Sequence, residues 1–327
     1  MGDVAMTVPV IKNVLQQNPD LVITVVSNAL FQPLFAGLER CNFYSAELKG
    51  KHKGVAGIYK LYKELTLSHR FTAIADLHSV LRSTILTSFF KLRGYQSATI
   101  DKGRADKKLL TKKDNKELQQ LPTSFERYAA VFKKIGFNCS LQVEEAIYPK
   151  QIIPSDAVQY FTNSSTIIGI APFAFHKEKM FALERMKLVV KNISNSGSTV
   201  LLFGGGKEEI AILQSWQHEL QDNIFSVAGK FSFANELAII SNLTQMISMD
   251  SANMHLASLF AVPVISIWGA THPYAGFYGW GQQPENIVSV AIDCRPCSVF
   301  GNKPCWRGDN ACMAKITEKM IVDKVMK

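Results

Sequence analysis

The sequence has few of the features that mark membrane-spanning, secreted or disordered proteins. No unbroken apolar run reaches about 18 residues, the length that a membrane-spanning helix needs. The amino terminus has no basic stretch followed by an apolar one, which a secretory leader requires. Charged residues make up only 19% of the chain, a fraction that argues against disorder. We therefore expect a folded, cytoplasmic protein.

The chain is large enough for more than one hydrophobic core. It has 327 residues, of which 47% are apolar. Single cores stop growing at about 250–300 residues, so two domains are more natural than one. Residues near Ala146–Tyr160, with Pro149 and Pro154, have the composition of a linker. We predict an N-terminal domain over residues 1–150 and a C-terminal domain over residues 151–327.

Acidic residues fall short of basic ones in the first half alone. Residues 1–150 contain 22 Lys and Arg against 13 Asp and Glu, whereas residues 151–327 contain 14 of each. The whole net charge of +9 therefore belongs to the first half. A one-sided basic domain favours an anionic partner such as nucleic acid, a membrane surface or an acidic substrate. The densest basic stretch, residues 102–113, fits a solvated loop equally well.

Short apolar runs alternate with helical patterns along the chain, which is typical of parallel sheets covered by helices on both faces. In the first half we predict strands at Leu21–Ser27 and Thr72–Asp76 and helices at Ala5–Asn18 and Val80–Leu92. In the second half we predict strands at Thr166–Ala171, Thr199–Phe203, Ile224–Val227, Gln245–Met249 and Val264–Trp268. Helices are expected from near Glu178, Lys207, Phe233 and Asn253, and a last helix from Met313 to Lys327. The fold class is thus α/β, with two Rossmann-like, doubly wound domains facing a cleft.

One strand is apparently absent from the first domain. The residues Met1 to Pro9 read as a strand-to-helix turn with no strand before it. A doubly wound domain places its first strand centrally, so its loss would leave a gap in the sheet. We expect that about ten apolar residues precede this turn in the natural chain.

The clearest chemical signal lies between the strand ending at Met249 and the next helix. Asp250 and Ser251 stand where helix N-caps stand, and the first amides of that helix would be free to bind a diphosphate. His255 follows about one turn later and can donate a hydrogen bond to a phosphate or a sugar hydroxyl. By spacing alone, an ordinary capped helix with a satisfied histidine explains the same residues.

Basic and glycine-rich turns follow other strands of the second domain. Lys177 and Lys179 come after the first strand, where one of them could neutralise a leaving diphosphate, although two surface lysines are the alternative. The turn at residues 203–209 lacks the first glycine and the Ser or Thr of a Walker motif. Its Glu208 or Glu209 could accept ribose hydroxyls instead. Gly229 and Lys230 form a similar turn.

In the first domain, three polar side chains follow strand ends. Asp3 lies at the opening turn, where a carboxylate could act as general base on an acceptor hydroxyl. His78 and Arg82 are four residues apart, which would place them on one helix face and let them hold an anionic acceptor. Capping and surface ion pairs are the alternatives for all three.

Four of the six cysteines are clustered near the carboxyl terminus. Cys294, Cys297, Cys305 and Cys312 are separated by two, seven and six residues. Four thiolates in one loop suit tetrahedral zinc, whereas disulfides are disfavoured in the cytoplasm. We predict a structural zinc site, with reduced cysteines that simply pack the loop as the alternative.

Taken together, these segments resemble glycosyltransferase family 9, the lipopolysaccharide heptosyltransferases, over essentially the whole chain. The family's opening Met-Gly-Asp-x-x-x-Thr-x-Pro matches Met1 through Pro9, and its catalytic base falls on Asp3. Its diphosphate-binding lysine falls on Lys179, and Ala182 stands where the family has proline. Its Asp-Ser/Thr-Gly-x-x-His-Leu-Ala motif falls on Asp250 to Ala257, with Ala252 in place of glycine. By this resemblance the donor-binding residues are Lys179, Glu208, Glu209, Gly229, Lys230, Asp250, Ser251, Ala252, Asn253, Met254 and His255.

The resemblance implies a GT-B fold and an inverting, metal-independent glycosyltransferase. The donor would be a nucleotide diphosphate sugar, ADP-heptose by the family's pattern. The acceptor would be an anionic lipid-linked glycan of the lipopolysaccharide core, held at the cytoplasmic face of the inner membrane by the basic first domain. Three other interpretations stay open: a relative using another nucleotide sugar or surface glycan, a non-catalytic sugar-nucleotide binder, and a nucleic-acid-binding protein. The last is disfavoured because the basic residues lack interleaved aromatics.

Overall fold

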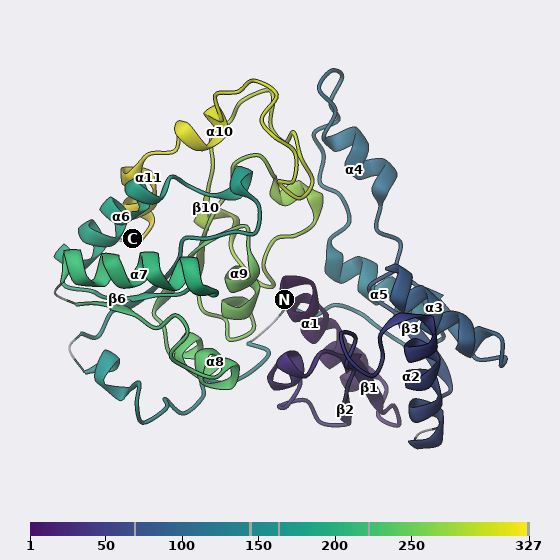
Figure 1. Cartoon of the computed structure of the whole chain (residues 1–327). Helices are drawn as coiled ribbons and strands as arrows, with labels where there is room; N and C mark the ends of the chain where they lie inside the picture. The colour runs from purple at the N-terminus through teal and green to yellow at the C-terminus, as the bar shows by residue number, and fades with distance from the viewer. Residues whose placement is uncertain (69, 144–145, 163, 222, 326–327) are drawn as a thin grey trace. The chain divides into compact units, whose positions relative to one another are not determined.

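The computed structural model describes residues 1–68, 70–143, 146–162, 164–221 and 223–325. The chain divides into two compact units (Figure 1). Unit 1 comprises Met1, Asp3–Gly103 and Pro122–Val143, and unit 2 comprises Gly2, Arg104–Leu121 and the residues from 146 onwards. In the described part of the chain, no helix combines the length and the apolar character needed to cross a membrane.

Unit 2 is built on one six-stranded sheet whose strands all run parallel. They lie in the order β10-β9-β8-β5-β6-β7. The strands are β5 (Ile167–Ala171), β6 (Thr199–Leu202), β7 (Ile224–Ser226), β8 (Gln245–Met249), β9 (Val264–Ile267) and β10 (Ile287–Val288). The five strands predicted here are confirmed to within one residue at each end, whereas β10 was not predicted.

Helices cover both faces of this sheet. The helices α6 (Leu183–Asn195), α7 (Lys207–Leu220) and α11 (Glu318–Val325) share one hydrophobic core with alternate strand residues such as Ile168 and Ile170. On the other face, α9 (Ala252–Ser258) packs against β8 and β9 beside α8 (Phe233–Ser241). All five residues of β5 are buried as a result, which explains why its sequence is apolar without alternation.

The helix predicted to begin near Glu178 begins later. Residues Lys177–Lys179 form a single 3₁₀ turn, η3, and α6 starts only at Leu183. Between them Met180 has an extended backbone, and Phe181 is buried in the core with its N–H 3.3 Å from the sulfur of Met249. The local residues favour a helix, but burial of Phe181 requires an extended chain.

The predicted last helix is two helices. The short α10 covers Ala311–Ala314 and α11 covers Glu318–Val325, while the predicted end at Lys327 lies outside the described residues. Arg185 of α6 stabilises the break. Its guanidinium donates to the carbonyls of Ala314 (3.0 Å) and Ile316 (2.7 Å) and to both oxygens of Glu318 (2.7 and 2.9 Å).

Unit 1 also alternates strands with helices, but its sheet is in two pieces. β1 pairs in parallel with β2, from Ile23 opposite Cys41 to Ser27 opposite Ser45, and β3 pairs with β4. The predicted β1, β3, α1 and α3 are confirmed, whereas the other elements were not predicted. The elements are α1 (Gly2–Gln17), β1 (Ile23–Ser27), η1 (Ala29–Leu34), β2 (Cys41–Ser45), α2 (Gly54–Ser68), β3 (Ala73–Asp76), α3 (Leu81–Lys91), β4 (Gln96–Thr99) and α5 (Ser124–Lys134).

Residues 104–121, which contain α4 (Arg104–Leu110), belong by their contacts to unit 2 although unit 1 precedes and follows them. The N–H of Leu121 donates to the carbonyl of Tyr274 (3.0 Å), and the Lys116 ammonium donates to the carbonyl of Cys294 (2.7 Å). Leu110 and Leu121 share a small apolar core with residues of unit 2. Residues 104–121 are therefore an integral part of unit 2 rather than a solvated loop.

Candidate functional site

The strand order of unit 2 reverses at β5. The chain passes from β5 to β6 on one side, whereas β8 lies on the other. In open parallel sheets, ligands bind beyond the carboxyl ends of the strands at such a switch point. The segments that leave β5 and β8 there carry Lys179 and Asp250, which were predicted to bind the donor.

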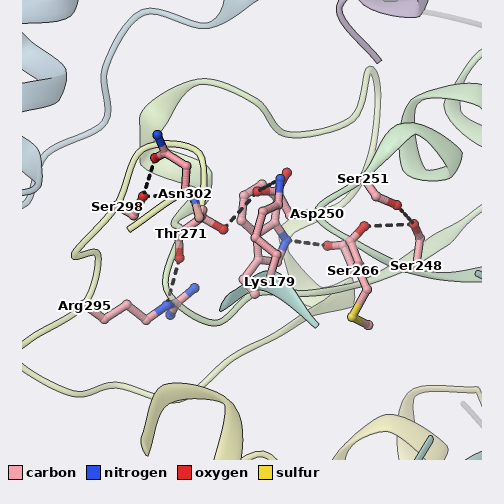
Figure 2. A network of polar contacts seen from close by, with 12 residues as sticks. Lys179, Ser248, Asp250, Ser251, Ser266, Thr271, Arg295, Ser298 and Asn302 are labelled. Atoms are coloured by element: carbon pink, nitrogen blue, oxygen red, sulfur yellow. Dashed lines mark hydrogen bonds and ion pairs between the residues drawn. The ribbon is translucent and has the colours of Figure 1, made fainter. Parts of the chain in front are cut away.

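Lys179 and Asp250 form an ion pair, with 2.9 Å between the ammonium nitrogen and a carboxylate oxygen (Figure 2). The side chains are only 16% and 6% exposed. The same carboxylate oxygen accepts a hydrogen bond from the hydroxyl of Thr271 (2.9 Å). Two residues predicted separately from distant motifs are thus joined, and the cation is held at the switch point.

A glycine in the cysteine-rich loop fixes the path of the Lys179 side chain. A β-carbon at Gly301 would lie 2.3 Å from Cγ of Lys179, and this glycine has a positive φ of 72°. The amide of Gly301 donates to the hydroxyl of Ser298 (2.9 Å). Only glycine therefore lets the loop backbone lie against the lysine stem.

Ser251 occupies the N-cap position of α9 but does not cap the helix. Its side chain makes no capping bond, and its hydroxyl lies 3.1 Å from that of Ser248 instead. Asp250 is likewise engaged elsewhere, with Lys179 and Thr271. The first amides of α9 are thus left without a side-chain cap beside the ion pair, as a diphosphate site would need.

His255 is a buried, neutral histidine. It is 6% exposed, and burial lowers its pKa to about 3, with the nearby Lys179 ammonium as a second cause. Within the described residues its Nδ1 atom has no hydrogen-bond partner. A buried polar atom without a partner is costly, so this nitrogen is a natural contact for a ligand.

Arg295 supports the site and was not predicted. Its Nε donates to the carbonyls of Gly269 (2.8 Å) and Thr271 (3.1 Å) and so holds the turn that carries the Thr271 hydroxyl. Burial lowers the pKa of Arg295 to about 10, which keeps it charged at neutral pH. Sequence patterns drew attention only to the cysteines on either side of this arginine.

The structure separates the two glutamates of the glycine-rich turn. Glu209 accepts a hydrogen bond from the amide of Gly205 (2.8 Å) and holds the turn before α7, whereas Glu208 is exposed. Gly229 has a φ of 70° in the turn after β7, where Lys230 is exposed. Glu208 is therefore the better candidate for ribose contact, and both turns lie at carboxyl ends of strands.

The predicted residues of unit 1 line one cavity of about 910 Å³, whose walls include Asp3, His78 and Arg82. Asp76 shapes the turn after β3, because its carboxylate accepts from the amides of His78 (3.0 Å) and Ser79 (2.8 Å). The prediction that His78 and Arg82 share a helix face is wrong. His78 lies in this turn, before α3 begins at Leu81, because Asp76 stabilises the turn.

The four clustered cysteines are free thiols in unit 2. Burial raises the pKa of Cys312 to about 11, and the charges of Cys297, Cys294 and Cys305 add to this effect. Among the residues that the structure describes, no three His, Cys, Asp or Glu side chains are arranged to hold a metal ion. The structural zinc stays a prediction, and elemental analysis of the purified protein tests it.

Comparison with known proteins places the chain in a family. The model of glycosyltransferase family 9 (heptosyltransferase) matches residues 58–304. Lipooligosaccharide heptosyltransferase 2 of Campylobacter jejuni subsp. jejuni serotype O:6 is 23% identical over 169 residues, covering 50% of this chain and 52% of that relative. The chain thus spans about half the length of such curated relatives in these alignments.

Solved structures match over more of the chain. The glycosyl transferase of family 9 from Veillonella parvula superposes with a TM-score of 0.76 at 17% identity, covering 100% of this chain and 93% of that one. The E. coli heptosyltransferase WaaC with ADP gives a TM-score of 0.68 at 16% identity, covering 100% and 96%. At these identities the likeness shows the fold.

The fold and the switch-point site define the class as a GT-B protein with two Rossmann-like units. The family model covers more than half of the sequence. The chain belongs to glycosyltransferase family 9 (heptosyltransferase).

Proposed function

We propose that this protein transfers a heptose from ADP-heptose to a lipopolysaccharide-core acceptor, with inversion at the anomeric carbon. One observation carries the proposal: Lys179 is paired with Asp250 at the β5–β8 switch point of a family 9 chain. The solved E. coli relative with ADP supports an adenine nucleotide as the leaving group.

Unit 2 is the donor half of the proposed enzyme. A diphosphate bound at the carboxyl ends of β5 and β8 replaces Asp250 as the anionic partner of Lys179. The uncapped first amides of α9 add partial positive charge, and neutral His255 contributes one hydrogen bond. These groups stabilise the negative charge that develops on the departing ADP. The family resemblance implies that no metal ion is required for this.

Unit 1 supplies the base and the acceptor site. Asp3 takes the proton of an acceptor hydroxyl, whose oxygen attacks the anomeric carbon. The bond from that carbon to the phosphate oxygen breaks, and ADP leaves with the electron pair. His78 and Arg82, in the same cavity lining as Asp3, bind anionic groups of the acceptor.

The charge of unit 1 suits an anionic, lipid-linked acceptor. This unit holds 15 Lys and Arg against 8 Asp and Glu, so it carries most of the net charge of +9. An excess of cations of this size attracts the anionic surface of the cytoplasmic leaflet. We therefore place the enzyme at the cytoplasmic face of the inner membrane, in peripheral contact with it.

Release of nucleotide from a panel of donor sugars tests the proposal. Lys179→Met should lower kcat/KM for ADP-heptose by about 10²-fold or more, because a group that stabilises leaving-group charge is lost. Asp3→Asn should lower kcat by about 10²–10⁴-fold. Lys191→Met, on the exposed side of α6, is the matched control and should behave as wild type.

Each other outcome selects a different function. Unchanged turnover in Asp3→Asn removes Asp3 as the base. Release of UDP or GDP, with no release of ADP, assigns another nucleotide sugar as donor. Binding of ADP-heptose without release in the presence of acceptor makes the protein a sugar-nucleotide binder.

A further inference from the structure

Two large aromatic side chains are half-exposed on unit 2, where residues 104–121 meet the cysteine-rich loop of residues 293–309. Trp306 is 51% exposed and Phe300 is 52% exposed. The proposed transfer chemistry uses neither side chain. Exposed rings that lie close together, rather than scattered singly, mark a surface that binds a partner.

Contacts between the two segments join these rings to lysines. The ammonium of Lys113 lies over the indole ring of Trp306, 4.5 Å from its centre. Phe300 packs against Phe277, with 5.6 Å between the ring centres. The ammonium of Lys107 lies 4.2 Å from the centre of the Phe277 ring. All five residues belong to unit 2, and we call them the aromatic–lysine surface.

The segment that forms one side of this surface is basic. Residues 104–121 hold six Lys and Arg against three Asp and Glu. Lys108, Lys112 and Lys113 are exposed. Exposed aromatic rings next to several lysines are the side chains that proteins place at the surface of an anionic membrane. The rings lie at the level of the lipid headgroups, and the ammonium groups reach the phosphates.

We propose that the aromatic–lysine surface is the part of unit 2 that contacts an anionic phospholipid membrane. Trp306 and Phe300 would lie at the level of the headgroups, and the lysines of residues 104–121 would bind the lipid phosphates. The inference rests on the peripheral membrane contact proposed above, and it names a surface for that contact.

This surface is joined to the donor site by a single loop. Gly301 directly follows Phe300, and its backbone lies against the stem of Lys179. Contact of Phe300 with the membrane would therefore bring the loop that positions Lys179 to the lipid surface. A lipid-linked acceptor would then meet the enzyme close to the group that stabilises the departing diphosphate.

A membrane fits this surface better than a soluble sugar chain does. A sugar ring stacks on the face of an aromatic ring, but the Lys113 ammonium lies over a face of Trp306. Phe300 packs against Phe277. A bilayer needs no free ring face, because partial insertion of the ring among the headgroups is sufficient.

The fluorescence of Trp306 tests the inference directly. The chain has four tryptophans, and the other three, Trp216, Trp268 and Trp280, are buried. Brominated phospholipids in vesicles of phosphatidylglycerol and phosphatidylethanolamine should quench the emission, whereas brominated vesicles of phosphatidylcholine alone should not. Trp306→Phe should still bind the anionic vesicles, but the quenching should be lost.

The affinity for anionic vesicles provides a second measurement. Trp306→Ser should weaken binding at least about tenfold, because an interfacial ring is lost. Leu188→Ser, at a similarly exposed apolar position on α6, is the matched control and should bind as wild type does. Lys112→Gln should weaken binding about fivefold at low salt. Lys191→Gln, at an exposed position on α6, should not weaken it.

Vesicle binding without quenching would overturn the inference but leave the proposed membrane location in place. Quenching that persists in Trp306→Phe, or no vesicle binding at all, would also overturn the inference. A response of Trp306 to a lipid-free anionic oligosaccharide, with none to vesicles, would assign the surface to a glycan instead.

Sedimentation as a dimer, with Trp306 shielded from iodide before vesicles are added, would assign the surface to a second copy of the chain. Nucleotide release with a lipid-free acceptor is measured separately and requires no membrane. Loss of that release contradicts the proposed function, and loss of quenching contradicts only this surface.

Discussion

At the scale of single residues, Gly301 controls the Lys179 side chain without carrying any charge. We expect Gly301→Ala to weaken donor binding at least about tenfold, because the new methyl group would lie 2.3 Å from Cγ of Lys179 and displace the stem. Calorimetric titration with ADP measures this effect.

Gly308→Ala is the matched control for this prediction. Gly308 lies in the same loop and has a positive φ of 80°, but no atom lies within 4 Å of the place of its β-carbon. Both variants therefore have the same kind of backbone strain, and only one collides with Lys179. Equal loss of ADP affinity in the two would show that loop strain, and not the position of Lys179, matters.

His255 predicts how stability depends on pH. Its pKa is about 3 in the folded protein against 6.5 ordinarily, so the unfolded chain binds more protons between these values. The contribution of His255 to the free energy of unfolding is complete above pH 6.5. It is lost as the pH falls toward 3, at up to about 1.4 kcal/mol per pH unit. His255→Gln should therefore lose less stability than wild type between pH 6.5 and 5 in urea unfolding.

The charged residues of the site were predictable from the sequence, whereas the residues that position them were not. Lys179, Asp250 and His255 lie in the segments that follow the ends of β5 and β8, where parallel sheets present ligand contacts. Thr271, Arg295 and Gly301 act on them from loops that are distant in sequence. No local pattern shows that a glycine in one loop accommodates a lysine from another, so such residues become visible only once the chain is folded.

At the scale of elements, Arg185 stabilises the break between the last two helices, α10 and α11. It bonds carbonyls at the end of α10 and the carboxylate of Glu318 at the start of α11. Arg185→Ala should lower the free energy of unfolding by on the order of 1–3 kcal/mol, since two carbonyls and the Glu318 carboxylate lose their charged donor. Arg185→Lys should recover little, because lysine cannot bond two sites in one plane. Denaturant unfolding measures both variants.

Arg307→Ala supplies the comparison. Arg307 pairs with Asp309 in an exposed position, 2.8 Å apart, and exposed pairs contribute about 0–1 kcal/mol. A loss in this variant as large as that in Arg185→Ala would show that the link between the two helices has no special role.

Helices and strands were predictable where the local sequence pattern and the tertiary contacts favour the same structure. The strands of unit 2 are apolar and end in turn residues, and these were predicted closely. Helix ends were missed where tertiary contacts override propensity, at Phe181 and at Arg185. In unit 1, α5 begins with a capping box in which Thr123 and Glu126 bond each other's backbone amides, a signal present in the sequence but not used.

At the scale of the whole molecule, residues 104–121 make the first half of the chain dependent on the second. A fragment of residues 1–150 would lack Tyr274 and Cys294, to which this segment is bonded. We expect the fragment to bind a hydrophobic dye more strongly than the same fragment with residues 104–121 replaced by a short Gly/Ser linker. Equal dye binding by the two fragments would contradict this dependence.

The placement of this segment also bears on synthesis. Lys116 bonds carbonyls of Asp293 and Cys294, which are 177 and 178 residues further along the chain. On the ribosome, α4 therefore emerges long before its docking surface exists. Contacts of such sequence separation form late and slow the folding of the domains that need them. Unit 2 can therefore reach its final state only after nearly the whole chain has been translated, whereas unit 1 ends at Val143 and contains none of this segment.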